Sequence, residues 1–232
     1  MDASPLIDAF TRYSGLFLDA TLMTLGLALS ALGAGLILAM VFALGELSRF
    51  RPIAWLTTSV VTIVRGLPEL LIIFFVYFGF THALFLLTDQ FIELSPFTAG
   101  TIALSLIYSA YASQILRGAL LSVARGQKEA ARALGIPPRR AFFRIVLPQA
   151  WRHALPGLGN QWLVLLKDTA LVSLIGINDI LRQAKFISIQ TYESFTWYCI
   201  AALIYLVITL LSQNLLNRMK QHSSRYVREV KA

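Results

Sequence analysis

The sequence predicts an all-α membrane protein, and three observations lead to that class. Of the 232 residues, 57% are hydrophobic and only 14% are charged, with a mean hydropathy of +0.68. Soluble domains carry about 25% charged residues, so much of this chain must face lipid. The apolar residues also form runs long enough to cross a bilayer, and the basic residues gather between those runs, as in the loops of membrane proteins.

Five segments are expected to cross the membrane. About 30 Å of hydrocarbon requires roughly 20 helical residues, and a helix satisfies its own backbone hydrogen bonds in lipid. Three of the segments contain no Asp, Glu, Lys or Arg, and two carry charges near their middle. The predicted spans are 20–45, 53–80, 95–116, 155–178 and 195–217. Together they make residues 1–232 a single transmembrane domain.

The distribution of basic residues orients these spans. If the N-terminus is outside, the inner segments hold 15 of the 20 lysines and arginines and the outer segments hold 3, while 2 lie within spans. Cytoplasmic loops carry an excess of Lys and Arg. The N-terminus is therefore expected outside and the C-terminus in the cytoplasm.

The inner loop over residues 117–150 is predicted to be a compact helix–turn–helix. Residues 127–134 are good helix formers, and Gly135 followed by two prolines ends that helix. A second amphipathic segment runs over about 138–146. A basic helix, a glycine turn and another helix resemble a DNA-binding motif, but tethering between two membrane spans excludes entry into a DNA groove. A loop that only contacts anionic lipid headgroups is the plainer alternative.

This loop resembles the EAA loop of ATP-binding-cassette importer permeases. In order it contains Glu129-Ala130-Ala131, three residues, Gly135, nine residues, Ile145, one residue and Leu147-Pro148, which matches every fixed position of that motif. Residues 65–71 and 166–173 resemble segments of the polar amino acid permeases, and the similarity runs from about residue 21 to 216. The chain is most similar to the histidine/lysine/arginine/ornithine and octopine type of subunit.

The resemblance implies a permease subunit of an importer that moves amino acids, foremost basic amino acids or opines, across the bacterial inner membrane. The first helix of the loop would be a coupling helix, whose ATPase-contact residues are Glu129, Ala130, Ala131 and Gly135. The implied partners are a second permease subunit, expected to be a paralogue, two ATPase subunits and a periplasmic or extracellular amino-acid-binding protein. ATP and Mg²⁺ would bind to the ATPase partners, so this chain is expected to hold no cofactor and to be no enzyme.

Four charged residues lie inside predicted spans. Arg65 and Glu69 lie in the second span, Lys167 and Asp168 in the fourth. Charges in the bilayer are costly and mark transport pathways or buried pairs, and transporters place substrate sites at interrupted helices. Proline and glycine, at Gly66 and Pro68 and again over 156–159, are expected to interrupt both spans. The charges could bind the carboxylate and amine of a substrate, or pair structurally, as Arg65 with Glu69 four residues on.

Other functional classes find little support in the sequence. There is no glycine-rich phosphate loop ending in Lys-Ser/Thr, no metalloprotease His-Glu pair and no serine-elbow motif. The three histidines are far apart and the single cysteine, Cys199, lies in an apolar run, so neither a metal site nor a catalytic set is predicted. Nucleic acid is excluded as a partner, and membrane lipid is expected. A passive membrane channel or scaffold without ATP coupling remains the alternative to a driven importer.

Overall fold

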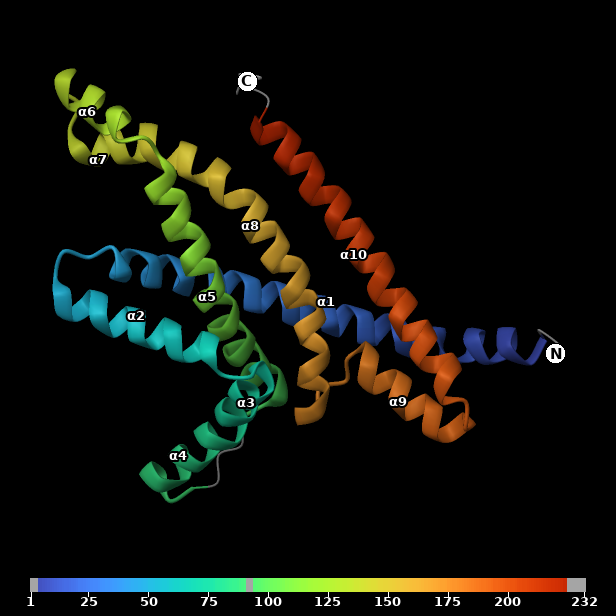
Figure 1. Cartoon of the computed structure of the whole chain (residues 1–232). Helices are drawn as coiled ribbons and strands as arrows, with labels where there is room; N and C mark the ends of the chain where they lie inside the picture. The colour runs from blue at the N-terminus through green and yellow to red at the C-terminus, as the bar shows by residue number, and fades with distance from the viewer. Residues whose placement is uncertain (1–3, 91–93, 225–232) are drawn as a thin grey trace. The chain divides into compact units, whose positions relative to one another are not determined.

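The computed structural model describes residues 4–90 and 94–224, and every element within those ranges is helical, which confirms the all-α class. Two elements are π-helical, η1 and η2, and one is a 3-10 helix, η3. In chain order (Figure 1) the elements are α1 (Ser4–Glu46), α2 (Arg51–Gly66), α3 (Glu69–Phe74), η1 (Phe75–Gly79), α4 (Phe80–Thr88), α5 (Pro96–Ser122), α6 (Arg125–Ala133), α7 (Pro138–Ala141), η2 (Phe142–Val146), α8 (Leu147–Asp168), η3 (Thr169–Ile175), α9 (Ile180–Thr191) and α10 (Ser194–Ser224). The basic residues Arg225, Arg228 and Lys231, which the orientation argument counts, lie outside the described residues.

Three helices in the described part of the chain are long and apolar enough to cross a membrane: Arg12–Glu46 of α1, Pro96–Ser122 and Ser194–Gln221 of α10. A fourth crossing is reached if α2 and the helix that starts at Glu69 are taken together as one broken span. Helix α8, which holds most of the predicted span 155–178, is more polar than these. The count of five spans stays a prediction.

The expected interruption beside Arg65 is confirmed. Helix α2 ends at Gly66, Leu67 is extended with ψ of 146°, and α3 begins after Pro68. A proline disfavours the helical conformation of the residue before it, which explains a break at Leu67. Arg65 and Glu69 therefore lie on two different helices. The i,i+4 spacing that would pair them on one continuous helix is interrupted.

The second interruption was expected at the wrong place. Helix α8 continues through Pro156 and ends at Asp168, where the chain passes into the 3-10 helix η3. A helix between other helices tolerates a proline, because neighbouring groups satisfy the freed backbone carbonyl. Asp168 thus lies at a helix end, as does Glu69.

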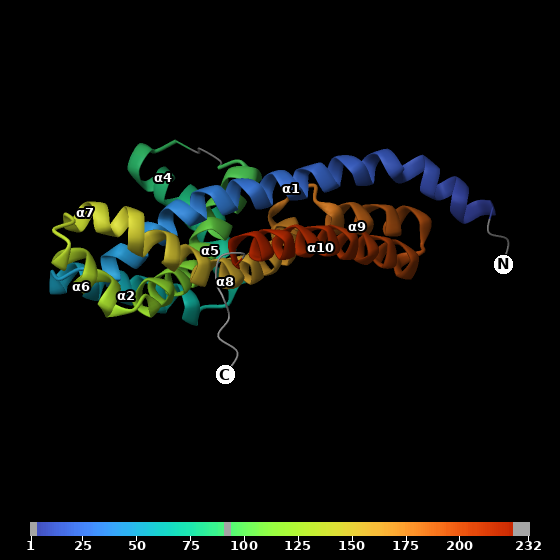
Figure 2. The same cartoon turned by 90° about the horizontal axis from the view of Figure 1, so that it is seen from above.

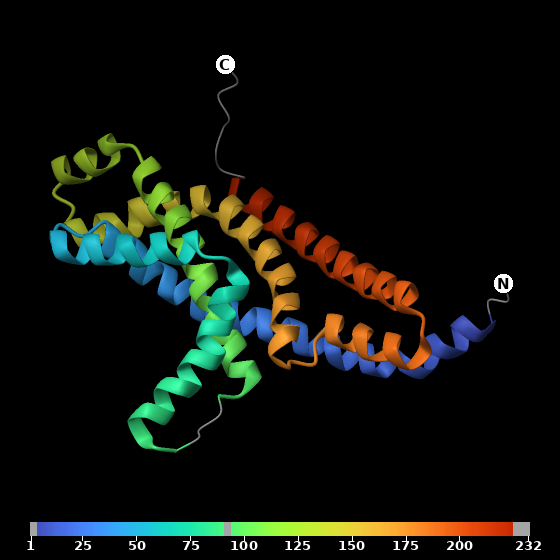
Figure 3. The ribbon, with the colours of Figure 1, turned by 60° about the horizontal axis from the view of Figure 1, so that its bottom comes forward.

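The chain folds into two compact units, each assembled from three separate stretches. The first unit contains 1–34, 68–105 and 164–209, and the second contains 35–67, 106–163 and 210–232. In the first unit, α3, η1 and α4 follow one another as one rod (Figure 3).

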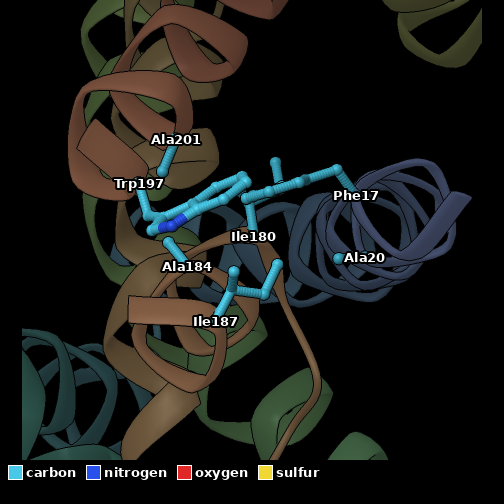
Figure 4. Packing of buried hydrophobic residues seen from close by; sticks show 7 residues of the cluster. All are labelled: Phe17, Ala20, Ile180, Ala184, Ile187, Trp197 and Ala201. Carbon is cyan, nitrogen blue, oxygen red and sulfur yellow. The ribbon is translucent and has the colours of Figure 1, made fainter. Parts of the chain in front are cut away.

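The core of the first unit is built around Trp197. Its indole is 1% exposed and packs with apolar residues of α1 and α9, as Figure 4 shows for the cluster of Phe17, Ala20, Ile180, Ala184, Ile187, Trp197 and Ala201. The Phe17 ring stacks at 6.0 Å between centroids, and the indole Nε1 donates to Thr191 Oγ1 at 2.7 Å. This packing holds the short helix α9 alongside the first part of α10 (Figure 2).

Glycines bring the helices of the second unit close together. A Cβ atom added to Gly157 on α8 would lie 2.8 Å from the Ile115 side chain on α5, and one added to Gly45 on α1 would lie 2.5 Å from Thr57 on α2. Without a hydrophobic drive between helices in lipid, such close packing supplies much of their attraction. The part of α1 in this unit, residues 35–46, and α2 accordingly lie side by side (Figures 1 and 3).

Candidate functional site

The loop between α5 and α8 is a helix–turn–helix, as predicted. Helix α6 ends in a Schellman motif: the Ile136 amide donates to the Ala131 carbonyl at 2.9 Å, and the Gly135 amide donates to the Arg132 carbonyl at 3.0 Å. The motif needs a left-handed residue after the C-cap, and Gly135 supplies it with φ of +69°. Gly135 therefore fixes the turn through its backbone.

The loop presents one side of α6 to its surroundings. Glu129 and Ala130 are exposed, and so is Leu134, with 77% of its surface accessible. Ala131 is only 2% exposed, so its methyl group packs within the chain. Glu129, Ala130 and Leu134 are therefore among the side chains of the loop that remain available to a protein partner. Leu134 was not predicted to contact a partner, although its position just before the helix-ending Gly135 is visible in the sequence.

A small apolar cluster within the second unit closes the base of the loop. Val123 follows α5, and Val146 and Ala150 lie in η2 and α8; all three are buried. Leu120 and Phe142 pack against them. The cluster ties the two ends of the loop together, so a force on α6 would act on the ends of α5 and α8 together.

In the first unit, three of the predicted in-membrane charges lie together. Asp168 lies close enough to the carboxyl of Glu69 and to the ammonium of Lys167 for direct electrostatic interaction. Its Oδ2 atom is buried and accepts from no donor among the described residues, and the neighbouring Glu69 carboxyl can hydrogen-bond to Asp168 only when one of the two carboxyls is protonated. Buried polar atoms are nearly always satisfied, and two neighbouring carboxyls with an unsatisfied oxygen form a place where a cationic donor would be stabilised.

Arg65, the fourth predicted charge, lies in the second unit. Its guanidinium lies over the ring of Tyr111, with 5.4 Å from Cζ to the ring centroid. Such a cation–π contact contributes about 0.5–2 kcal/mol, depending on how far water is excluded. Arg65 thus has an aromatic partner on α5.

The structure also contains a buried polar cluster that the sequence analysis missed. Asp179 is fully buried as the N-cap of α9, where its Oδ1 accepts from the Arg182 amide at 3.0 Å and its Oδ2 accepts from the Tyr205 hydroxyl at 3.4 Å. The Thr24 hydroxyl accepts from the Ile180 amide at 3.4 Å. Burial raises the pKa of Asp179 to about 6. An Asp directly before an apolar helix is a cap signal, so the cap, but not its burial, could have been predicted.

A second missed residue is Glu46, the last residue of α1. Its side chain is 3% exposed, and both of its oxygens accept hydrogen bonds from the Gln114 side-chain amide, at 2.7 and 2.8 Å. Arg117 lies 3.8 Å away and is half exposed. This group joins the end of α1 to α5, through Gln114 eleven residues and Arg117 eight residues before α6 begins.

Comparison with known proteins gives consistent results. The family described as binding-protein-dependent transport system inner membrane component matches residues 18–224. The arginine ABC transporter permease protein ArtQ of Escherichia coli (strain K12) is 54% identical over 223 residues, which cover 89% of this chain and 94% of that protein. The histidine/lysine/arginine/ornithine transport system permease protein HisQ of Salmonella typhimurium is 37% identical, covering 91% of this chain and 95% of that one.

A solved structure supports the same conclusion. A crystal structure of an amino acid ABC transporter with histidines contains a chain that is 36% identical and superposes with a TM-score of 0.82. The match covers 92% of this chain and 97% of that chain. The similarity extends over almost the whole length of both chains.

Proposed function

Because this chain belongs to the family of binding-protein-dependent transport system inner membrane components, we propose that it imports cationic amino acids through a pathway that its α6 loop couples to ATP hydrolysis. The chain is the permease subunit of an amino acid ABC importer and a multi-pass protein of the inner membrane. It is not itself an enzyme, since the ATPase of such importers is in partner subunits.

The charged groups around Asp168 support a cationic substrate. This carboxyl has a buried oxygen that accepts from no donor, a second carboxyl, Glu69, beside it, and Lys167 next to it in sequence. An amino acid with a positive side chain would neutralise the carboxyl pair, and Lys167 would bind its carboxylate. The names of the relatives ArtQ and HisQ, which specify arginine and histidine/lysine/arginine/ornithine, support this class. Arg65 is assigned a structural role on Tyr111.

The proposed coupling of transport to ATP hydrolysis depends on the α6 loop. We assign Glu129, Ala130 and the exposed Leu134 to the surface that an ATPase subunit contacts, and Gly135 to the turn that positions them. The buried Ala131 would pack α6 against the rest of the loop. The ATPase subunits would bind ATP and Mg²⁺. Five spans with the N-terminus outside, as the 15 inner and 3 outer basic residues favour, place this loop in the cytoplasm.

The assembly is proposed to contain further subunits. A second permease, a paralogue of this chain, would complete the pathway, two ATPase subunits would bind on the cytoplasmic side, and an external binding protein would deliver the amino acid. An ATPase partner and a binding protein accompany ABC importer permeases in general. The paralogue and the number of copies are the specific part of this proposal.

The test is transport by the reconstituted assembly in liposomes. Arginine or lysine, supplied with the binding protein, should stimulate ATP hydrolysis and accumulate inside, whereas an acidic amino acid should do neither. Glu69→Gln should raise the KM for arginine about tenfold, as expected for a lost charge-assisted hydrogen bond. Glu193→Gln, which neutralises an exposed carboxyl between α9 and α10, should leave it unchanged.

Two results would contradict the proposal in different ways. Flux that does not depend on ATP would indicate a passive channel. Unchanged arginine kinetics in both Glu69→Gln and Asp168→Asn would exclude the carboxyl pair from the substrate pathway, while ATP coupling would still hold.

A further inference from the structure

An apolar groove of about 200 Å³ lies in the second unit, where α1 and α5 end and the chain returns into α8. Its floor consists of the buried alanines Ala43, Ala119 and Ala154, which are 1%, 6% and 1% exposed. Its sides consist of large side chains that remain open to the surroundings, Leu44, Phe143 and Trp151, which are 54%, 57% and 44% exposed. The groove is therefore lined by small buried residues and by large apolar side chains that remain partly exposed.

The lining of the groove fits a hydrocarbon chain. Its lining residues are all Ala, Leu, Met, Phe or Trp. A segment of one acyl chain can lie in it without leaving a polar group unsatisfied. The exposed Phe143 and Trp151 would then contact that chain along its sides.

The position of the groove places it at the edge of the bilayer. Ala43 lies three residues before the end of α1, and Ala119 lies three residues before the end of α5. The half-exposed Trp151 fits this level, since tryptophan is enriched where hydrocarbon meets headgroups. A lipid in the groove would therefore have its headgroup beside the α6 loop.

The charges next to the groove are positive. Residues 130–166 contain no Asp or Glu. Arg140 lies one helical turn before Phe143, Arg144 follows Phe143 directly and Arg152 follows Trp151, and all three arginines are exposed. None of the three guanidinium groups has an ion pair or side-chain hydrogen bond within the described part of the chain. Unpaired guanidinium groups beside an apolar groove complement a molecule with an anionic head and an apolar tail.

We propose that this groove binds one anionic phospholipid, with an acyl chain over the alanine floor and the phosphate at Arg140 and Arg144. The bound lipid fills the space between the end of α1, the end of α5 and the start of α8, and so stabilises the base of the α6 loop. The proposal depends on the membrane location and on the groove, and not on the substrate or the ATP coupling.

The experiment captures the lipid at its site. The chain, assembled with its ATPase subunits, is placed in nanodiscs of phosphatidylethanolamine with a minor fraction of phosphatidylglycerol that carries a photoreactive acyl chain. After irradiation, mass spectrometry is expected to find adducts on the groove segments 116–120 and 142–154. The same photoreactive chain on phosphatidylethanolamine is expected to give about tenfold less, because each arginine near an anionic headgroup strengthens its binding several-fold.

Variants separate the headgroup contact from general attraction to the membrane. Arg140→Gln with Arg144→Gln should reduce the phosphatidylglycerol adducts about tenfold. Arg218→Gln with Lys220→Gln, which removes two positive charges from α10, should not change them. If the first variant does not assemble, raising the salt concentration around the unmodified protein should weaken the phosphatidylglycerol adducts and leave the phosphatidylethanolamine adducts unchanged.

Two results would overturn the proposal. Equal labelling by the two lipids, insensitive to the arginine substitutions and to salt, would mean that the groove contacts bulk lipid without selecting it. Labelling that appears only when the partner subunits are omitted would mean that a protein covers the groove in the assembly.

Discussion

At the scale of single residues, Gly135 shows how a backbone requirement can be tested separately from a side-chain contact. Apart from Gly135 itself and its two chain neighbours, no residue has an atom within 4 Å of a Cβ placed on Gly135, so a substitution there has room, and its cost comes from the left-handed conformation. That cost is about 1–2 kcal/mol for most residues and less for Asn. Gly135→Val should therefore disturb the Schellman turn more than Gly135→Asn.

The measurement for Gly135 combines hydrogen exchange and ATP hydrolysis. Gly135→Val is expected to increase amide exchange over residues 131–136 and to lower amino-acid-stimulated ATP hydrolysis, with Gly135→Asn close to the unmodified protein. Equal loss in both variants would show that the absence of a side chain, and not the turn, is what the position requires.

Asp179 gives a prediction for pH. Burial raises its pKa to about 6 in the folded protein, above the value of about 3.9 for an unfolded chain. The folded state thus binds the proton more tightly. The stabilisation linked to that proton is fully present below about pH 4 and is lost as the pH rises through 6. The free energy of unfolding should therefore decrease by on the order of 2 kcal/mol between pH 4 and pH 7.

Asn is the matched substitution for Asp179. It keeps an oxygen that can cap α9 but does not ionise. Asp179→Asn should therefore remove most of the decline in melting temperature between pH 4 and pH 7, while Asp179→Ala should be less stable than Asp179→Asn at every pH by about 1 kcal/mol through the lost cap. A pH dependence that persists in Asp179→Asn would assign it to another group.

At the scale of secondary-structure elements, the group around Glu46 joins two helices. A carboxylate at a helix C-terminus is unfavourable next to the helix dipole, so Glu46 depends on its partners. Its hydrogen bonds to Gln114 are short and partly buried, whereas Arg117 is 3.8 Å away and 45% exposed. An exposed ion pair contributes about 0–1 kcal/mol, and a hydrogen bond to a charged group about 1.5–3 kcal/mol. The hydrogen bonds to Gln114 should therefore contribute more to stability than the ion pair with Arg117.

Two alanine variants compare these contributions. Glu46→Ala is expected to destabilise the protein by about 2 kcal/mol, and Arg117→Ala by at most about 1 kcal/mol, measured as shifts in thermal unfolding in nanodiscs. If Arg117→Ala were the more damaging variant, the ion pair and not the amide would hold α1 to α5.

The elements that the sequence predicted are those with local signals. The α6 loop follows from helix formers, a glycine and two prolines within a dozen residues, and the break at Leu67 follows from Pro68. The position of the second break could not be read in this way, because the response of a helix to Pro156 depends on the neighbours that satisfy its freed carbonyl. Helix α9 was likewise missed, since its stability comes from packing on Trp197.

Within the candidate site, the sequence identified the charges but not their partners. Glu69, Lys167 and Asp168 stand out because charges are rare in apolar spans. That Glu69 and Asp168 are neighbours depends on contacts between segments about a hundred residues apart, which no local pattern encodes. The same is true of the contacts of Glu46 with Gln114 and of Asp179 with Tyr205. In both, a carboxyl gains a structural role only because the fold buries it beside its partner.

At the scale of the whole molecule, the number of crossings decides where the loop and the termini lie. In a background in which Cys199 is replaced by serine, single cysteines at the exposed positions Arg49, His82, Arg139 and Glu193 can be labelled with a membrane-impermeant thiol reagent. Five spans with the N-terminus outside predict labelling of His82→Cys and Glu193→Cys in spheroplasts, and of Arg49→Cys and Arg139→Cys only after the membrane is opened.

The pair Arg139 and Glu193 tests the polar fourth span directly, because α8 and η3 lie between them. If that segment crosses the membrane, the two cysteines must react from opposite sides. If it does not cross, they must react from the same side, and the chain would have four spans. A polar helix is stable across a bilayer only when other helices shield its charges, so opposite labelling would also place Lys167 and Asp168 in the interior of the assembly, where a substrate pathway requires them.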